Sequence, residues 1–327
     1  MNNLPIRVSN ELVDEFTNKM EMLRSGIKSQ AVVPSGFKEL DNKIGGFQPG
    51  RLYVVGSRPA MGKTALMINW IRNIIDSTNN PKNVLVITLE CSAQSIVQRL
   101  VSCMASVPLE KINRGGLTNE EWKSIQDTIL PRLRTAPLLI EENTVCTLAQ
   151  LREKCLQMKE EDNLGIVFID YLQLITPVKG RYRDEEIAEL MRGLKDLCKE
   201  AGVPFVVLSQ LSRAAEYRNE NKLPRLSDLR DSGTIEQIAD VVMFIYRPEY
   251  YDILLNELGE STNGEMHLKI AKNRMGELDT IELVADLPLQ HIYEKEDFTN
   301  PNFDNSEWKA YFERQKQKFK PDNETPF

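Results

Sequence analysis

Short runs of apolar, β-branched residues alternate with amphipathic stretches along most of the chain, which predicts strands alternating with helices. Strands separated by helices pair in parallel and are covered on both faces. The pattern therefore predicts an α/β fold with a mostly parallel central sheet. The expected strands are 52–55, 83–89, 138–141, 166–169, 204–208, 241–246, 266–271 and 280–284. The expected helices are 93–106, 119–130, 148–160 and one that runs through 187–198 and is ended by Gly202.

The two ends of the chain depart from this alternation. Residues 8–25 carry apolar side chains at helical spacing, which predicts one exposed amphipathic helix that packs either on its own domain or on a neighbouring subunit. After Asp297 the composition turns polar and predicts a loose tail. We therefore expect a helical linker at 1–30, a main domain at 31–297 and a tail at 298–327. The apolar residues of the linker helix are Leu12, Val13, Phe16, Met20 and Leu23.

Composition narrows the class of protein. The 327 residues are 41% hydrophobic and 27% charged, and no apolar run approaches the ~18 residues that span a bilayer, so a soluble cytoplasmic protein with no membrane contact is expected. Five cysteines without a CxxC pair argue against a disulfide framework or a zinc site. Two histidines argue against a Ser-His-Asp hydrolase. The net charge of −7 means that any contact with nucleic acid must be local.

The stretch from Arg51 to Ile75 reads as a buried strand, a turn closing on Gly62-Lys63-Thr64, and an apolar helix, which is the order a phosphate-binding loop requires. Backbone N–H groups of such a turn point at phosphate oxygens, Lys63 reaches the β- and γ-phosphates, and the Thr64 hydroxyl holds Mg²⁺. Hence ATP and Mg²⁺ are the expected cofactors. The plainer interpretation is an ordinary strand-to-helix turn. The expected nucleotide-binding residues are Ser57, which stands where the motif usually has glycine, and Arg58, Pro59, Ala60, Met61, Gly62, Lys63, Thr64 and Ala65.

Three more polar residues follow expected strands, at the ends where open parallel sheets bind ligands. Asp170 ends GIVFID and is the expected second partner of Mg²⁺, whereas a capping or solvent-facing aspartate is the plainer role. Glu90 ends NVLVITLE and is expected to deprotonate the water that attacks the γ-phosphate; the alternative is a charge at a helix N-terminus. Gln210 ends PFVVLSQ and is expected to hydrogen-bond the γ-phosphate, unless it is only a polar strand end.

Two cations end a late strand. Period-two alternation over 266–274 predicts that Lys272 and Arg274 share one face with the apolar Leu268 and Ile270. Cations that extend beyond a core in this way suit a finger that reaches into a neighbouring subunit's nucleotide site, where an arginine stabilises transition-state charge. The alternative is a solvated strand end.

The segment 212–233 is long, irregular and rich in arginine, and long segments of this kind in compact domains are usually functional or mobile. Arg230 and the Ser232–Gly233 backbone are expected to hold phosphates of single-stranded DNA without sequence preference. Arg181 and Arg183, in the loop after Asp170, either extend this path or belong to a solvated loop.

Taken in order, GSRPAMGKT, VITLE, VFIDYLQLI, VVLSQLSR, LPRLSDLRDSGTIEQIADVVMFIYR and AKNRMG resemble the RecA-like C-terminal motor domain of DnaB-type replicative helicases, from about Pro34 to Val284. The resemblance implies a RecA-like P-loop NTPase fold and a homo-oligomeric, hexameric ring on single-stranded DNA, with a helicase loader or primase as further partners. The implied roles are Lys63 and Thr64 at the phosphates and Mg²⁺, Glu90 as catalytic carboxylate, Asp170 at Mg²⁺, Gln210 as γ-phosphate sensor, Lys272 and Arg274 donated in trans, and Arg230, Asp231 and Gly233 in the DNA loop.

The sequence departs from the family in three respects. About thirty residues before the motor domain cannot be the family's helical collar domain, so the chain is either a fragment or a collar-less phage or mobile-element protein; residues 8–25 resemble the linker helix that docks on the adjacent subunit. Asp231 stands where the family more often has glutamate, and the stretch after Gly276 lacks the usual second glycine.

The leading hypothesis is an ATP-driven helicase that moves along single-stranded DNA and unwinds duplex during DNA replication. The runner-up is a RecA-like ATPase that binds single strands, as a recombination mediator or regulator, without unwinding. A third hypothesis, a nucleotide-binding assembly module that is no enzyme, is disfavoured by the pair Glu90 and Asp170.

Overall fold

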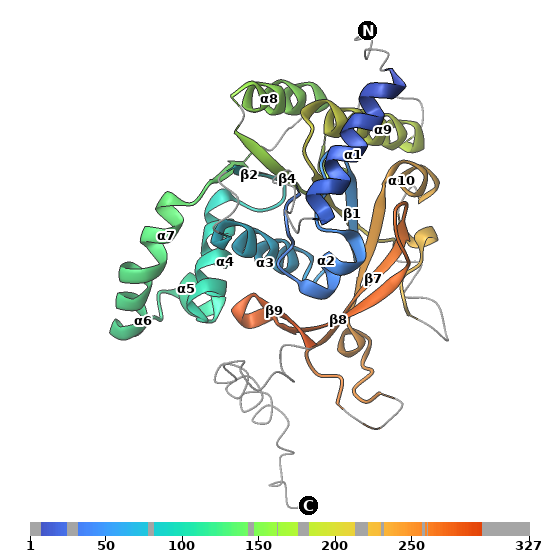
Figure 1. Cartoon of the computed structure of the whole chain (residues 1–327). Helices are drawn as coiled ribbons and strands as arrows, with labels where there is room; N and C mark the ends of the chain where they lie inside the picture. Colours follow the sequence, from blue (N-terminus) through green and yellow to red (C-terminus); the bar gives the residue numbers. More distant parts are fainter. Residues whose placement is uncertain are drawn as a thin grey trace, which may run out of the picture.

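The fold is known from a computed structural model, in which the described residues form one sheet of nine strands in the order β3-β2-β4-β5-β1-β6-β7-β8-β9, with helices on both faces (Figure 1). The structure describes residues 8–24, 32–77, 82–142, 147–161, 163–175, 183–212, 222–229, 232–256, 259 and 261–295. The predicted α/β class and its mostly parallel sheet are confirmed. The predicted tail at 298–327 lies outside the described residues.

Six strands pair in parallel and bring their carboxyl ends to one edge of the sheet. Both faces of this part of the sheet are covered, which is why β1, β4 and β6 are buried along their whole length rather than alternating. The parallel strands are β1 (Leu52–Ser57), β2 (Asn83–Thr88), β3 (Leu138–Glu142), β4 (Leu164–Asp170), β5 (Phe205–Gln210) and β6 (Val241–Tyr246).

The last three strands extend the sheet in antiparallel fashion, which the sequence pattern did not predict. The connection between β7 and β8 is only residues 274–278, too short for the crossover that parallel pairing needs. The short β9, four residues long, also escaped prediction. These strands are β7 (Glu265–Asn273), β8 (Asp279–Asp286) and β9 (His291–Glu294).

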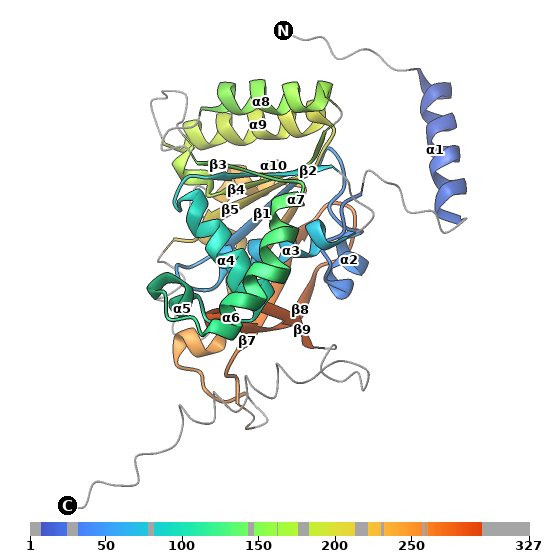
Figure 2. The ribbon, with the colours of Figure 1, turned by 90° about the vertical axis from the view of Figure 1, so that its left-hand side faces the viewer.

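Helices cover both faces of the sheet (Figure 2), and an apolar core fills the space between sheet and helices on each face. The first core contains Trp70, Phe47 and Phe168 and lies under α2 (Lys38–Ile44), α3 (Lys63–Asp76) and α4 (Ala93–Ala105). The second contains Leu194 and Phe205 and lies under α8 (Leu148–Glu160), α9 (Arg183–Ala201) and α10 (Ser232–Ile238). The helix expected at 148–160 and the stop at Gly202 are confirmed.

A small satellite core holds α5 (Leu109–Arg114), α6 (Asn119–Ser124) and α7 (Leu130–Thr135) beside α4. The single helix predicted over 119–130 instead continues to Thr135 through a π-helical turn at Ile125–Ile129. Pro131 follows this turn and has no N–H to continue the regular ladder, which gives a physical reason for the change in hydrogen-bond pattern.

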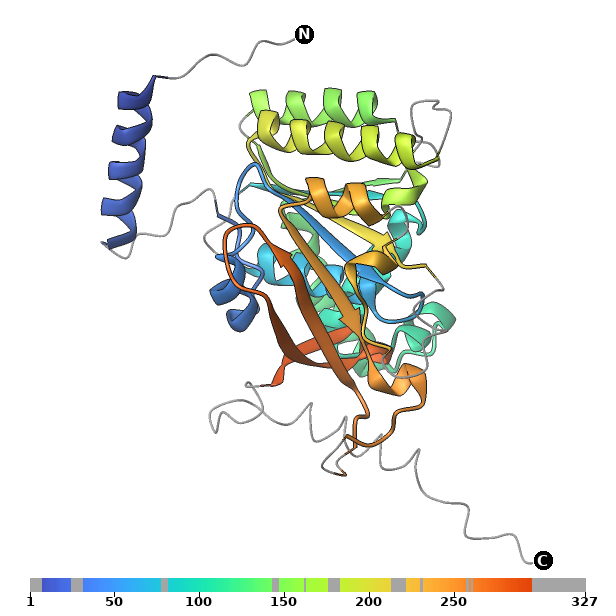
Figure 3. The ribbon, with the colours of Figure 1, turned by 90° about the vertical axis from the view of Figure 1, so that its right-hand side faces the viewer.

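The N-terminal helix α1 (Ser9–Arg24) is present as predicted and stands clear of the layered body in Figures 2 and 3. Its apolar side chains Leu12, Val13 and Phe16 are exposed by 45%, 59% and 62%, so they are not packed on the chain's own sheet. Docking on a neighbouring subunit stays a prediction. Within the described residues, no helix is long and apolar enough to cross a membrane.

Candidate functional site

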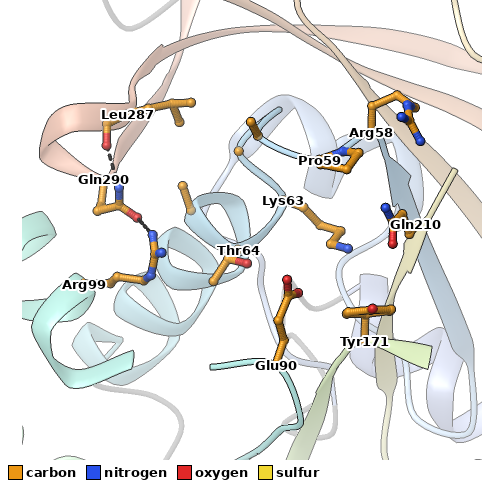
Figure 4. A pocket seen from close by; sticks show the side chains of 13 residues that line it. Arg58, Pro59, Lys63, Thr64, Glu90, Arg99, Tyr171, Gln210, Leu287 and Gln290 are labelled. Carbon is orange, nitrogen blue, oxygen red and sulfur yellow. Dashed lines mark hydrogen bonds between the residues drawn. The ribbon is translucent and has the colours of Figure 1, made fainter. Parts of the chain in front are cut away.

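The carboxyl ends of β1, β2, β4 and β5 surround a cavity of about 270 Å³. Predicted site residues from three of these strand ends line it, namely the phosphate loop after β1, Glu90 after β2 and Gln210 at the end of β5. The side chains of Lys63, Glu90 and Gln210 point toward the same space (Figure 4). The remaining lining residues are Arg58, Pro59, Ala60, Gly62, Thr64, Ala65, Arg99, Tyr171, Leu287 and Gln290.

The loop between β1 and α3 has the backbone shape that receives a phosphate. Gly62 adopts φ 91°, and a Cβ there would lie 2.9 Å from both Leu287 and Met266, so glycine is required by conformation and by space. No side chain caps the first turn of α3 among the described residues, and that turn has no acidic residue. Its N–H groups therefore face the cavity at the positive end of a helix, where anions bind.

Two arginines connect this loop to the neighbouring strands β5 and β6. Arg58, only 7% exposed, donates a hydrogen bond of 2.7 Å to the carbonyl of Leu211 beyond β5. Arg247, at the end of β6, donates one of 3.4 Å to the carbonyl of Ala60, whose φ is 62°. Of the predicted nucleotide-binding residues, Ser57 and Met61 are buried and do not line the cavity.

Lys63 begins α3, and its ammonium group lies 4.8 Å from the centre of the Tyr171 ring. Burial lowers the pKa of Lys63, and the nearby carboxylates of Asp170 and Glu90 oppose that effect. A partly desolvated ammonium beside these carboxylates gains a strong partner when phosphate oxygens arrive. This arrangement suits a lysine that binds the β- and γ-phosphates.

Asp170 is fully buried at the end of β4, and its Oδ2 accepts a hydrogen bond of 2.9 Å from the Thr64 hydroxyl. Its other oxygen, Oδ1, is buried without a hydrogen-bond partner within the described residues. Burial raises the pKa of the Asp170 carboxyl, while Lys63 and Thr64 lower it. The peptide bond from Asp170 to Tyr171 is cis. A carboxylate oxygen without a partner, next to a hydroxyl, is a fitting donor pair for Mg²⁺.

The number of protein ligands near Asp170 also shows what kind of metal site the residues can form. Within the described residues, no group of three or more His, Cys, Asp or Glu side chains is placed to hold a metal ion. Mg²⁺ in nucleotide sites takes one or two protein oxygens, and phosphates and water complete its shell. The pair Thr64 and Asp170 fits this mode, and it does not fit an ion held by protein ligands alone.

Glu90 is exposed at the cavity, beyond the end of β2. The hydrogen bonds at the N-terminus of α4 are accepted by other residues. Ser92 accepts a hydrogen bond from the Ser95 N–H, and Glu142 Oε2 accepts one of 2.8 Å from the Ala93 N–H. Glu90 therefore stands free of helix capping, as a general base requires.

Gln210 is held at its backbone by a residue that the sequence did not single out. The Gln210 N–H donates a hydrogen bond of 3.3 Å to Gln173 Oε1, and Gln173 Nε2 donates one of 2.9 Å to the Ser209 hydroxyl. Gln173 lies in the short helix after β4 and so connects the ends of β4 and β5.

Four cavity residues, Arg99, Tyr171, Leu287 and Gln290, were also missed. Arg99 on α4 donates a hydrogen bond of 2.6 Å to Gln290 Oε1, and Gln290 Nε2 donates one of 2.5 Å to the Leu287 carbonyl (Figure 4). Arg99 and Gln290 are far apart in sequence and belong to a helix and to the turn before β9. No local pattern brings them together, although the DYLQL motif did contain both Tyr171 and Gln173.

The prediction that Lys272 shares a face with Leu268 and Ile270 is wrong. In the pairing of β6 with β7, Ile270 lies opposite Met243 but Lys272 lies opposite Val242, so β7 carries a bulge between them. Met243 belongs to the first core and Val242 to the second. Because directly opposite residues share a face, the bulge turns Lys272 toward α9 and α10. The described cavity residues include neither Lys272 nor Arg274.

The predicted DNA-binding residues are described only in part. Gly233 lies exposed in the first turn of α10. Arg230 and Asp231 lie outside the described residues, as does Arg181, whereas Arg183 begins α9. The DNA path therefore stays a prediction.

Comparison with known proteins identifies the family. Residues 32–293 match the family model described as DnaB-like helicase C terminal domain. The replicative DNA helicase DnaB of Geobacillus stearothermophilus is 38% identical over 275 residues, which are 83% of this chain and 58% of that protein. The replicative DNA helicase DnaC of Bacillus subtilis strain 168 is 35% identical over 280 residues, 84% of this chain and 59% of that protein. The chain thus spans less than two thirds of these relatives.

Two solved structures agree with this result. A structure described as an ATPase domain superposes with a TM-score of 0.77 at 31% identity and covers 86% of this chain and 98% of its own. A DnaB-like replicative helicase, described with its interactions with primase, gives a TM-score of 0.75 at 31% identity over 89% of this chain and 67% of its own. The predicted RecA-like architecture is confirmed, and the chain belongs to the family of DnaB-like helicase C-terminal domains.

Proposed function

We propose that this chain is an ATP-hydrolysing motor that moves along single-stranded DNA and separates duplex DNA during replication. The observation that carries the proposal is the meeting of Lys63, Glu90 and Gln210 at one cavity, beside the hydrogen-bonded pair Thr64 and Asp170. Membership of the DnaB-like helicase C-terminal domain family and the names of its relatives support the link to DNA unwinding.

The residues divide the chemistry among them. Lys63 and the N–H groups of the α3 N-terminus bind the phosphates, while Thr64 and Asp170 would hold Mg²⁺. When bound, Mg²⁺ neutralises charge that develops on the phosphate oxygens. Glu90 takes the proton of the attacking water, and Gln210 hydrogen-bonds the γ-phosphate. The Tyr171 ring contacts the Lys63 ammonium group, with 4.8 Å from Nζ to the ring centre, and so helps to hold the ammonium at the cavity.

Lys272 and Arg274 are proposed to act on the nucleotide of a neighbouring subunit. Arg274 Nη1 lies 3.8 Å from Asp240 Oδ1, and Asp240 Oδ2 accepts a hydrogen bond from the N–H of Leu52, the first residue of β1. The phosphate loop follows the last residue of the same strand, Ser57. Six residues of strand span about 20 Å, so Arg274 cannot reach its own loop. A ring of subunits, hexameric by family resemblance, brings each cation pair to the next site.

The proposed DNA contact lies between the γ-phosphate sensor and α10. Gln210 ends β5, and the predicted phosphate-binding residues Arg230 and Gly233 precede or begin α10, which ends just before β6. The chain that follows Gln210 therefore connects the proposed γ-phosphate contact directly to the segment proposed to hold DNA. Primase or a helicase loader as partner is an expectation from the family, and the structure described with primase is that of a relative.

The deciding experiment is fork unwinding by the purified chain with ATP and Mg²⁺, with Glu90→Gln as the matched inactive protein. We expect strand separation that requires hydrolysis and a single-stranded tail. Hydrolysis stimulated by single-stranded DNA without strand separation would instead identify a single-strand-binding ATPase of the mediator or regulator type. Absence of hydrolysis under all conditions would remove the motor proposal.

A further inference from the structure

The bulge in β7 aims two cations at the end of a helix. Lys272, turned to the face of α9 and α10, donates a hydrogen bond of 2.7 Å from Nζ to the Ala239 carbonyl. The same Nζ donates to the carbonyls of Glu236 and, at 3.4 Å, Gln237. Without the bulge, Lys272 would face the first core, away from these carbonyls.

The second cation uses the same helix end. Arg274 Nη2 donates a hydrogen bond to the Gln237 carbonyl, and the Arg274 backbone N–H donates one of 3.0 Å to the Asp240 carbonyl. The last carbonyls of a helix have no partner within it and carry the negative end of its dipole. Lys272 and Arg274 are therefore both bound to the carboxyl end of α10, which lies beside β7 in Figure 1.

Asp240 ties this end of α10 to the rest of the sheet. It is 7% exposed, and its Oδ2 accepts hydrogen bonds from the Leu52 N–H at 2.8 Å and from Lys195 Nζ at 2.5 Å. Its Oδ1 lies 3.8 Å from Arg274 Nη1. One buried carboxylate thus contacts β1, α9 and the arginine.

We infer that Asp240 is a positioning residue for the cations Lys272 and Arg274, which act in trans, and that together with the carboxyl end of α10 it fixes where they stand at the subunit edge. The inference rests on the proposed function, and it adds a residue that touches neither nucleotide nor DNA. Arg274 keeps 46% of its side chain exposed, while its guanidinium group is held through Nη1 by Asp240 and through Nη2 by the carboxyl end of α10. An arginine held in this way loses less side-chain entropy when it engages a phosphate than an unrestrained one.

The first test is Asp240→Asn, which keeps the shape and removes the charge. A misplacement of about 1 Å in a catalytic group costs on the order of 10²-fold in rate, so we expect kcat for ATP hydrolysis to fall about 10- to 100-fold. KM for ATP should change less than about 3-fold, because the subunit's own phosphate loop is intact. Asp196→Asn on α9 removes an exposed carboxylate and is the matched control, expected to match wild type.

The second test asks on which subunit Asp240 acts. In a shared site the loop belongs to one subunit and the cations to the next, so mixing inactive Lys63→Ala with inactive Arg274→Ala restores some hydrolysis. Asp240→Asn should behave like Arg274→Ala: it should regain activity with Lys63→Ala and regain none with Arg274→Ala. Differently tagged subunits show that mixed oligomers form.

The opposite pattern overturns the inference. If Asp240→Asn regains activity with Arg274→Ala but not with Lys63→Ala, then Asp240 serves its own nucleotide site through β1. If it regains activity with neither, although the reference pair does, its role is general to folding. Should Asp240→Asn fail to fold by circular dichroism, Asp240→Glu keeps the charge, displaces it by one methylene and enters the same mixtures.

If the reference pair fails and titration of wild type with Arg274→Ala gives only a linear loss, the shared site is removed from the proposed function. A steeper than linear loss would instead show that every site must be intact. In both cases Asp240 is tested by a separate measurement. The double variant Asp240→Asn/Arg274→Ala is then compared with each single variant. A loss no greater than that of Arg274→Ala alone shows that Asp240 acts through Arg274. Multiplicative losses show that it does not.

Discussion

The hydroxyl of Thr64 donates a hydrogen bond of 2.9 Å to Oδ2 of Asp170, and so joins the start of α3 to the end of β4 across 106 residues of sequence. The contact leaves Asp170 Oδ1 buried and without a partner in the described part of the chain. A buried carboxylate in this state is costly unless a cation arrives. The pair therefore fits the proposed Mg²⁺ site, and its buried carboxylate is expected to lower the stability of the protein when no cation is bound.

Asp170→Asn tests this trade-off through pH. Burial raises the folded-state pKa of Asp170 above its ordinary value of 3.8, so the folded protein binds more protons than the unfolded chain between these two values. Stability of the nucleotide-free protein should therefore fall as pH rises from 3.8 through the raised pKa, and the cost persists above it. We expect Asp170→Asn to raise the Tm at neutral pH, by about 2–4 °C for each kcal/mol recovered, and to lose that advantage in acid.

Thermal unfolding from acid to neutral pH, without Mg²⁺, measures the effect. Calorimetry should show in parallel that Asp170→Asn has lost the Mg²⁺-dependent part of nucleotide binding. Asp196→Asn, an exposed aspartate on α9, is the control for removal of a charge. A Tm of Asp170→Asn below that of wild type at neutral pH would show that the carboxylate stabilises the empty protein.

Lys63→Ala should abolish turnover, because Lys63 is the cation at the start of α3, whereas the other cavity cations, Arg58 and Arg99, donate hydrogen bonds to the Leu211 carbonyl and to Gln290. Steady-state ATP hydrolysis is the measurement, with Lys199→Ala on the exposed side of α9 as control. A rate above a tenth of the parent's would contradict the assignment of this loop to phosphate binding.

Glu90→Gln should keep ATP and Mg²⁺ binding and stop hydrolysis, since the amide preserves the shape of the side chain but cannot accept the water's proton. Binding of a fluorescent ATP analogue and single-turnover hydrolysis separate the two effects. Glu120→Gln, exposed on α6, is the control. Equal losses of binding and turnover would make Glu90 a structural residue.

Arg230→Ala should weaken binding of single-stranded DNA by a similar factor for all sequences and lower the slope of log K against log salt by about 0.7, because one phosphate contact is lost. Fluorescence anisotropy of labelled oligonucleotides over a range of salt gives both quantities. Arg192→Ala on α9 removes an exposed arginine elsewhere and is the control. An unchanged affinity and slope would move the DNA path, with Arg181 and Arg183 the next candidates.

Arg274→Ala should fold and bind ATP and yet barely turn over, because a cation supplied in trans is worth about 10³ to 10⁵ in rate. When Arg274→Ala is mixed with wild type, the rate of hydrolysis should fall more steeply than the fraction of wild-type subunits if hydrolysis in one subunit depends on its neighbours. A strictly linear loss indicates that the sites work independently. If Arg274→Ala by itself were fully active, Arg274 would be only a surface charge. Such a charge contributes ~1 kcal/mol or less to the free energy of unfolding.

The sequence by itself determined the features that depend on neighbours in the chain. Thr118 with Glu121 and Thr147 with Gln150 form capping boxes, which sequence alone can indicate because each box closes its hydrogen bonds within four residues. The phosphate loop and the polar strand ends were also predictable. A parallel sheet always brings its carboxyl ends to one edge, so Glu90, Asp170 and Gln210 had to come together there.

Tertiary structure decided the features that depend on packing between distant segments. Alternation alone placed Lys272 with Ile270, and only the pairing of β7 against β6 shows the bulge that separates them. Arg99 meets Gln290, 191 residues away, because α4 and the turn before β9 close the same cavity. Asp240 gains its role from β1, α9 and Arg274 at once. Such contacts depend on how distant segments pack together in the folded protein, and the local repeat of apolar residues along the sequence does not predict that packing.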